Sequence, residues 1–230
     1  MAAPERTRGG MSERRRRTLR MNVSRAACRL FWERGVEATS GERIAQDAGV
    51  SVRTVWRHFR TKESCAEPIV AHGVEWFMSV VRDWPEEAAL AGHLTAEVRR
   101  HARTSRPQER ADELLALRMI SLAGTEPALR AAWLAACDRI EDELRTILAA
   151  RLELPAADLE VRLHAAAATA VVRVLEEQVG AAVLAGTARR EFGDPGLLAE
   201  RFAAAIRRAT GGAVGEPVGG PTRGRPGAGG

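Results

Sequence analysis

The sequence has no tyrosine, and aromatic residues make up only 4% of its 230 residues. Lysine is nearly absent too, because Lys62 is the single lysine among 35 basic residues and the others are arginines. Alanine and arginine dominate instead, and both favour helices. Hydrophobic residues still reach 45%, which is enough for a core, so the composition predicts a mostly helical globular protein.

Cysteine is scarce, and no apolar run is long. Cys28, Cys65 and Cys137 are odd in number and form no C-x-x-C pair. This pattern argues against a disulfide framework or a zinc site and favours thiols that pack as small hydrophobic groups. No apolar run approaches the roughly 18 residues of a membrane span, and no hydrophobic signal core stands at the N-terminus. We therefore expect a cytoplasmic protein with no membrane partner.

Catalytic and metal-binding motifs are also missing. The sequence contains no G-x-S-x-G, no phosphate-binding loop and no H-E-x-x-H. Its five histidines show no metal-ligand spacing on one helix face. We therefore expect no enzyme, no catalytic residues, no metal and no cofactor.

The net charge of +5 is unevenly distributed along the chain. Residues 1–62 carry a net charge of +9, and residues 63–230 carry −4. A basic head on an acidic body favours binding of a polyanion by the head, although an arginine-rich solvated surface has the same composition. The run Arg14–Arg17 is likewise open to two interpretations, a flexible arm that reaches the minor groove or the phosphates of DNA and a solvated tail.

Glycine, proline and apolar spacing divide the chain. We expect disordered tails at residues 1–13, with Met11 as a second candidate start, and at the Gly/Pro-rich residues 211–230. Between the tails, apolar residues recur at helical spacing, without internal repeats or strand-like alternation. A helix from Thr61 to about Trp84 is expected to kink at Pro68. The pattern predicts an all-α fold, with a head at 14–62 and a helical body at 63–210.

Residues 39–59 contain the most informative pattern, two short helices joined by a tight turn. Thr39 or Ser40 caps the first helix, and Thr39 with Glu42 fits a capping box. Gly49 supplies the turn conformation. Ser51 caps the second helix, whose positive N-terminal end suits a phosphate.

The second of these helices has two distinct faces. Val55 and Phe59 are four residues apart and are expected to face the core. The outer face is then left to Val52, Arg53, Trp56 and Arg57. This arrangement is typical of a helix-turn-helix that binds DNA. An ordinary helical hairpin is the alternative, but it rarely combines an A-G-V-S turn, two caps and surrounding positive charge.

Residues 25–67 resemble the DNA-binding head of the TetR family of regulators. The matching segments are A-x-x-L-F-x-E-R-G, T-S-x-x-x-I-A, A-G-V-S and H-F-x-T-K-E. The resemblance implies an all-α homodimeric transcriptional regulator, most simply a repressor, that binds a palindromic double-stranded operator and has a variable ligand-binding body.

The resemblance also implies individual DNA contacts. The family commonly has tyrosine or phenylalanine where Trp56 stands and tyrosine at or near Arg57, so the operator sequence does not carry over. Lys62 matches a lysine that contacts phosphate. The remaining implied contacts are Thr39, Ser40, Ser51, Val52, Arg53, Trp56, Arg57 and His58.

The body is similar, over residues 127–152 and 164–175, to a branch that includes regulators of acyl-CoA-like ligands. We expect a mostly apolar pocket for a small-molecule effector, hydrophobic or acyl-type, whose binding releases DNA. The helix that leaves the head, kinked at Pro68, is expected to act as the lever. Candidate lining residues, each with core packing as the alternative, are His101, Met119, Trp133 and Cys137.

The dimer is expected to form through the helices at about 160–185 and 195–209. Leu198, Phe202 and Ile206 supply an apolar stripe, and two such helix pairs make a four-helix bundle. Two alternatives stay open. A sealed body without a cavity favours an architectural DNA binder without an effector, and a pocket with paired ionisable residues of perturbed pKa favours an enzyme.

Overall fold

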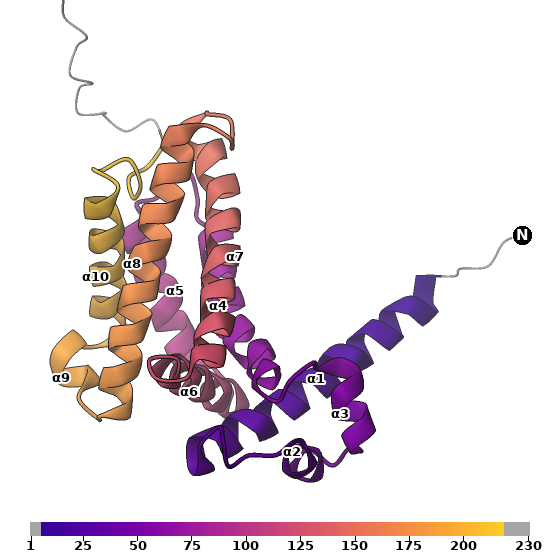
Figure 1. Ribbon diagram of the computed structural model, residues 1–230. Coiled ribbons are helices and arrows are strands. Elements are labelled where there is room, and N and C mark those ends of the chain that lie inside the picture. Colours follow the sequence, from indigo (N-terminus) through magenta and orange to yellow (C-terminus); the bar gives the residue numbers. More distant parts are fainter. Residues whose placement is uncertain (1–5, 219–230) are drawn as a thin grey trace, which may run out of the picture. The chain divides into compact units, whose positions relative to one another are not determined.

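The computed structural model describes residues 6–218, and every regular element in this range is a helix (Figure 1). The predicted all-α class is confirmed. The chain forms two compact units, which we describe separately. Unit 1 comprises the chain up to Glu75 together with Arg106–Ala136, and unit 2 comprises Trp76–Ser105 and the chain from Cys137 onward. The sequence-based boundary between residues 62 and 63 therefore differs from the division into units. Within the described range, no helix is both long and apolar enough to cross a membrane.

Unit 1 is built on one face of a long helix, α1. Val23, Cys28 and Phe31 on this face are fully buried. Burial raises the pKa of the Cys28 and Cys65 thiols to about 12, so both behave as apolar groups. Gly35 ends the helix in a left-handed conformation, with φ of 84°. The elements of this unit are α1 (Arg6–Arg34), α2 (Gly41–Asp47), α3 (Val52–His58), the 3-10 helix η1 (Glu63–Ala66), the start of α4 (Glu67–Arg82), α6 (Pro107–Leu122) and the start of α7 (Pro127–Leu152).

Both predicted tails are partly ordered. α1 begins at Arg6, so residues 6–13 are helical rather than disordered. Arginine and glutamate are good helix formers, and adding a residue to an existing helix costs far less than starting a new one. At the other end, Val214 is buried in unit 2, and the Leu90 amide donates to the Gly215 carbonyl at 2.9 Å. Residues 1–5 and 219–230 lie outside the described range.

The kink predicted at Pro68 is wrong. The 3-10 turn η1 separates Thr61 from α4, so α4 begins at Glu67 and Pro68 is its second residue. Amides in the first turn have no acceptor within the helix, which makes this position compatible with proline. The following amide, of Ile69, donates instead to Oγ of Ser24 in α1 at 3.2 Å.

Unit 2 contains the end of α4 and of α7 together with α5 (Leu90–Thr104), α8 (Leu159–Leu184), α9 (Ala188–Phe192) and α10 (Pro195–Ala209). α10 packs against both α5 and α8. Asp194 caps it by accepting from the amides of Gly196 and Leu197. Phe202 and Ile206 are buried inside the unit and Leu198 is half-buried. The apolar stripe assigned to the dimer contact therefore belongs to the core of the protomer.

A bidentate ion pair joins α1 to α6 inside unit 1. Nε and Nη2 of Arg25 donate to the two carboxylate oxygens of Asp112 at 2.8 and 2.7 Å. Gln108 adds a third hydrogen bond at 2.9 Å, and Asp112 is only 3% exposed. Burial by itself raises the pKa of Asp112, but the hydrogen bonds from Arg25 and Gln108 and the charge of Arg25 outweigh it and lower that pKa.

We expect Asp112→Asn to lower the free energy of unfolding by about 1–3 kcal/mol at pH 7, because it weakens a charge-assisted pair. A depressed pKa in the folded state stabilises the protein above the unfolded-state pKa of about 4, and this stabilisation is lost as the pH falls. Urea denaturation of both proteins from pH 7 to pH 3 should therefore show the difference shrinking. The exposed carboxylate Asp142, paired with Arg145, is the control, and its Asn variant should change little. A difference independent of pH would contradict the assignment.

Candidate nucleic-acid interface

α2, the turn and α3 form the predicted helix-turn-helix. Oγ of Ser40 accepts from the Arg43 amide at 3.2 Å, and Oγ of Ser51 accepts from the Thr54 amide at 3.1 Å. Gly49 has φ of 66°, the left-handed conformation that the turn requires. Both caps and the turn are thus as predicted. The capping box assigned to Thr39 is wrong, since Ser40 is the residue that caps α2.

Thr39 lies in the interior instead of at the surface. Its side chain is 1% exposed, and its hydroxyl donates to the Gly35 carbonyl at 2.8 Å. The single hydrogen of this hydroxyl is thus used in holding the loop between α1 and α2 and is not left to donate to a phosphate. The structure therefore corrects the implied phosphate contact at Thr39.

The faces of α3 agree with the sequence pattern. Val55 and Phe59 are buried. The side chains of Arg53 and Arg57 are exposed, and no ion pair joins either to a carboxylate in the described part of the chain. Of the other implied contacts, those that the structure leaves exposed are Ser40, Ser51 and Trp56, and those that are half-buried are Val52, His58 and Lys62.

Lys62 already has partners within the protein. Its Nζ donates to the carbonyls of Val36 and Glu37 at 2.7 and 3.1 Å. Two of its three donors thus hold the loop that follows α1, and one is left for a phosphate. This structural role was not predicted, because Lys62 is 26 residues from Val36 and 25 residues from Glu37, and no sequence pattern connects residues so far apart.

The C-terminal end of α3 lies against α1 in a positively charged environment. Nη1 of Arg20 donates to the His58 carbonyl at 2.7 Å, and its guanidinium lies over the Phe59 ring at 4.7 Å. Burial lowers the pKa of His58, and the charges of Arg16, Arg20 and Arg57 lower it further. This end of the helix-turn-helix therefore has the positive potential that attracts phosphate.

Trp56, one of the two positions at which the sequence departs from the pattern it resembles, lies over Gly41 at the start of α2. A β-carbon placed on Gly41 would lie 2.7 Å from Cη2 of the indole and closer still to Cζ2. Trp56 is nevertheless 43% exposed. The indole occupies space that a side chain at position 41 would fill, so glycine at that position allows the ring to lie there. Sequence reasoning singled out Trp56 but had no signal for its partner.

We expect Gly41→Ala to displace the Trp56 ring and to weaken binding to a selected DNA site several-fold. In a Trp56→Phe background, where the ring is smaller, the same change should have far less effect. The measurement is a double-mutant cycle of DNA affinities. Thermal unfolding of all four proteins shows whether the head stays folded. Equal losses in both backgrounds would show that Gly41 acts independently of Trp56.

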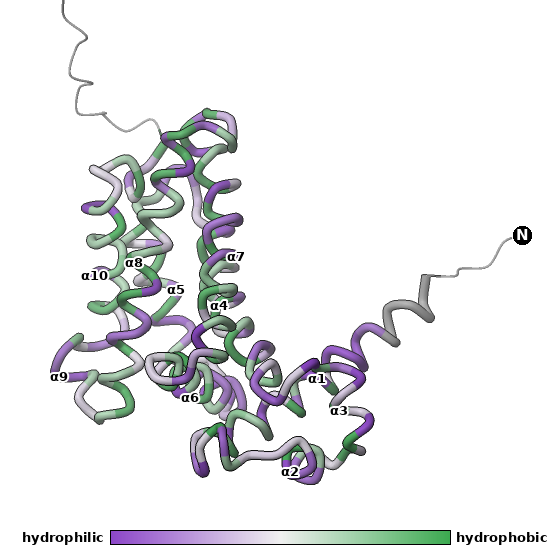
Figure 2. Tube along the Cα trace, viewed as in Figure 1, coloured by the Kyte–Doolittle hydropathy of each residue, from purple (hydrophilic) through white to green (hydrophobic). Residues whose placement is uncertain are grey.

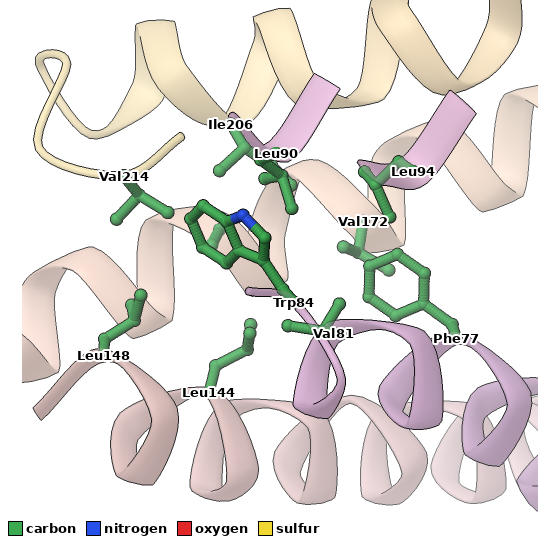
Figure 3. Close-up of a pocket in the computed structure, with 11 residues that line it drawn as sticks. Phe77, Val81, Trp84, Leu90, Leu94, Leu144, Leu148, Val172, Ile206 and Val214 are labelled. Atoms are coloured by element: carbon green, nitrogen blue, oxygen red, sulfur yellow. The ribbon is translucent and has the colours of Figure 1, made fainter. Parts of the chain in front are cut away.

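Unit 2 encloses a small apolar cavity of about 20 Å³ (Figure 3). Val81 of α4 and Trp84, which follows that helix, lie on one side of it, and the walls are otherwise made by α5, α7, α8, α10 and the segment after α10. The remaining lining residues are Phe77, Leu90, Leu94, Leu144, Leu148, Ala168, Val172, Ile206 and Val214. This volume accommodates about one water molecule, so a larger ligand has to displace side chains.

None of the four predicted pocket residues lines this cavity. In unit 1, Met119 and Trp133 are each 1% exposed. In unit 2, His101 lies against the Trp76 ring, with 4.4 Å between centroids, and Cys137 is buried. The sequence indicates that these residues lie on helices, but it does not show which helix faces border a cavity.

Residues 24–69 match the sequence profile of the family described as "Bacterial regulatory proteins, tetR family". One relative is the HTH-type transcriptional regulator TcmR of Streptomyces glaucescens, 31% identical over 146 residues. These cover 62% of this chain and 64% of TcmR, so the match spans less than two thirds of that curated relative.

Several solved structures share the fold. Salmonella enterica GusR has a TM-score of 0.55 at 18% identity, and the likeness covers 85% of this chain and 95% of GusR. Thermus thermophilus FadR, a TetR-family transcriptional repressor in complex with lauroyl-CoA, has a TM-score of 0.51 at 23% identity. The likeness covers 92% of this chain and 100% of FadR. The multidrug-binding protein EbrR, in complex with imidazole, has a TM-score of 0.50 at 22% identity. The likeness covers 81% of this chain and 94% of EbrR.

A capped helix-turn-helix with an exposed basic face, followed by a helical body, defines an all-α regulator of the helix-turn-helix class. The segment that contains the helix-turn-helix, residues 24–69, therefore matches the tetR family of bacterial regulatory proteins. The chain is also similar to the regulator TcmR over 62% of its length.

Proposed function

We propose that this protein is a cytoplasmic, homodimeric repressor that binds a palindromic double-stranded DNA operator and is released from it by a hydrophobic small molecule. It acts through binding and not through catalysis. The observation that carries the DNA part is the exposed face of α3, where Arg53 and Arg57 have no carboxylate partner within the described residues. Arginines left unpaired on a helix-turn-helix are suited to guanine edges and phosphates.

Arg53 is expected to contact a base. Arg53→Ala should relax the sequence preference at one operator position, at a cost of about 1–3 kcal/mol there. The probe is the operator recovered by selection from random duplex DNA, together with its single-base variants. Lys62→Ala is the comparison, because loss of a phosphate contact weakens all sequences alike. Its two loop hydrogen bonds mean that it should also lower the melting temperature. If Arg53→Ala lowered the affinity for all operator variants equally, Arg53 would be a contact to the DNA phosphate backbone and not to a base.

The dimer contact is better supported on the outer face of α8 than on the inner face of α10. Leu163 and Val174 of α8 are 60% and 42% exposed, and Leu197 of α10 is 40% exposed. Ala170, between the two α8 residues, is also exposed and permits a close approach of helices. Such large apolar groups are costly to leave in water, and burying them between two copies removes that cost.

We expect Leu163→Glu to give monomers in analytical ultracentrifugation and to abolish tight binding to the palindromic site, because one head then binds one half-site. The control is Leu134→Glu, which changes another exposed leucine, on α7, and should leave a dimer. Phe202→Glu is expected to unfold unit 2, since Phe202 is buried in the protomer. A Leu163→Glu protein that stays dimeric would refute this interface.

The effector part of the proposal rests on the apolar cavity in unit 2. All of its lining residues have apolar side chains. FadR, whose fold this chain shares, is seen with lauroyl-CoA, and EbrR is described as binding multiple drugs. A cavity of about 20 Å³ is too small for an acyl chain as it stands. The ligand therefore has to select an expanded state, which it shifts only as far as its affinity differs between states. His101, Met119, Trp133 and Cys137 stay as the competing set of lining residues.

Filling the cavity should block the effector without harming DNA binding. Ala168→Val adds two methyl groups at a buried position that lines the cavity, and we expect operator affinity to stay near the wild-type value while release by lauroyl-CoA is lost. Ala102→Val, at an exposed site on α5, is the matched control. Fluorescence anisotropy of a labelled operator gives both quantities. Release unchanged in Ala168→Val, but lost in Met119→Ala, would move the effector site to the residues predicted from the sequence.

A further inference from the structure

We propose that the basic turn of α1, residues Arg14–Arg17, binds the phosphate backbone of DNA beside the site occupied by α3. The inference rests on the proposed DNA-binding function and adds a second contact surface to it. Arg14–Arg17 form a helical segment continuous with the rest of α1. In Figure 1 the N-terminal part of α1 runs on past α3, and Figure 2 shows its described residues as hydrophilic.

All four arginines are exposed and uncompensated. In the part of the chain described, none of them forms an ion pair with a carboxylate, although Glu13 is close in sequence. Other arginines of the same helix are paired. Arg25 binds Asp112, and Arg29 binds Asp47 at 2.8 Å. Since about 3.6 residues make one helical turn, four consecutive arginines point to every side of α1, so at least one or two face any surface placed against it.

This basic turn is continuous with the DNA-facing end of α3. Arg16 precedes Arg20 by one helical turn and lies on the same face. Arg20 reaches the carbonyl of His58, the last residue of α3. Burial is the main cause of the lowered pKa of His58, and the charges of Arg16, Arg20 and Arg57 lower it further. A duplex held against Arg57 therefore has its flanking backbone beside the N-terminal part of α1.

Holding like charges one turn apart in a helix costs free energy. Binding an anion removes that cost, and the DNA backbone carries one negative charge for about every 1.7 Å of its axis. The conformation also decides which part of DNA is contacted. A helix with its side chains is about 10–12 Å wide, whereas the minor groove is about 6 Å wide. The helical segment does not fit the groove, so its arginines contact phosphates.

The test replaces Arg14, Arg15, Arg16 and Arg17 by glutamine, which keeps a similar helix propensity. The control replaces four exposed arginines of unit 2, Arg103, Arg139, Arg189 and Arg190, by glutamine and changes the net charge equally. Each protein is titrated with the selected operator and with a random-sequence duplex at several salt concentrations. Circular dichroism verifies that helix content is kept.

We expect the four-arginine variant of α1 to bind both duplexes more weakly and with a lower dependence on salt. Each lost phosphate contact reduces the slope of log K against log salt by about 0.9, so one or two contacts per head give about 2–4 per dimer. The preference for the operator over its single-base variants should be unchanged. Trimming the flanking base pairs should weaken the wild type but not the variant.

Three results would overturn the proposal. One is an unchanged salt slope in the α1 variant, the second is an equal fall in the control, and the third is a loss confined to particular bases. If the wild-type chain binds neither duplex, the proposed DNA-binding function itself fails. That outcome is distinct from a wild type that binds and a variant that binds equally well.

Discussion

The buried face of α1 is the constraint on which the position of α3 and its exposed arginines depends. α3 has 7 residues, and an isolated helix of that length is unstable in water. It holds its place because Val55 and Phe59 are buried and because Arg20 of α1 fixes the His58 carbonyl. Lys62 fixes the other side by binding the carbonyls that follow α1. Any displacement of α1 therefore moves the exposed arginines of α3.

The helix-turn-helix was predictable because its determinants are local. Ser40 and Ser51 accept from amides three residues away, and the conformation of Gly49 depends on its own missing side chain. The errors concern interactions between distant parts of the chain. The burial of Thr39 and the contact of Gly41 with Trp56 arise only when α1, α2 and α3 pack together. Sequence spacing shows which residues share a face but not what lies opposite that face.

The same reasoning explains the errors in the body. Phe202 and Ile206 of α10 form a regular apolar stripe, which correctly predicts a buried face. The stripe does not say whether a second copy or the same protomer covers it, and here the protomer does. Leu163 is the opposite case, an apolar residue that is exposed and not buried. An alanine-rich helix such as α8 has apolar residues on nearly every side, so its sequence does not show which side is buried. Only the structure separates its exposed side from its buried one.

Arginines of α1 and α3 divide into those paired with a carboxylate and those without such a partner in the described chain. Arg25 and Arg29, farther along α1, are neutralised by carboxylates of α6 and α2. Arg14–Arg17, Arg53 and Arg57 have no carboxylate partner in the described chain. Exposed arginines without a carboxylate partner also occur elsewhere, for example Arg34 at the other end of α1, but Arg14–Arg17 form a run of four that Arg20 connects to the end of α3. A carboxylate partner within the protein would compete with phosphate for the same guanidinium donors. This division is therefore the one expected if the paired arginines stabilise the fold and the unpaired ones bind an external polyanion.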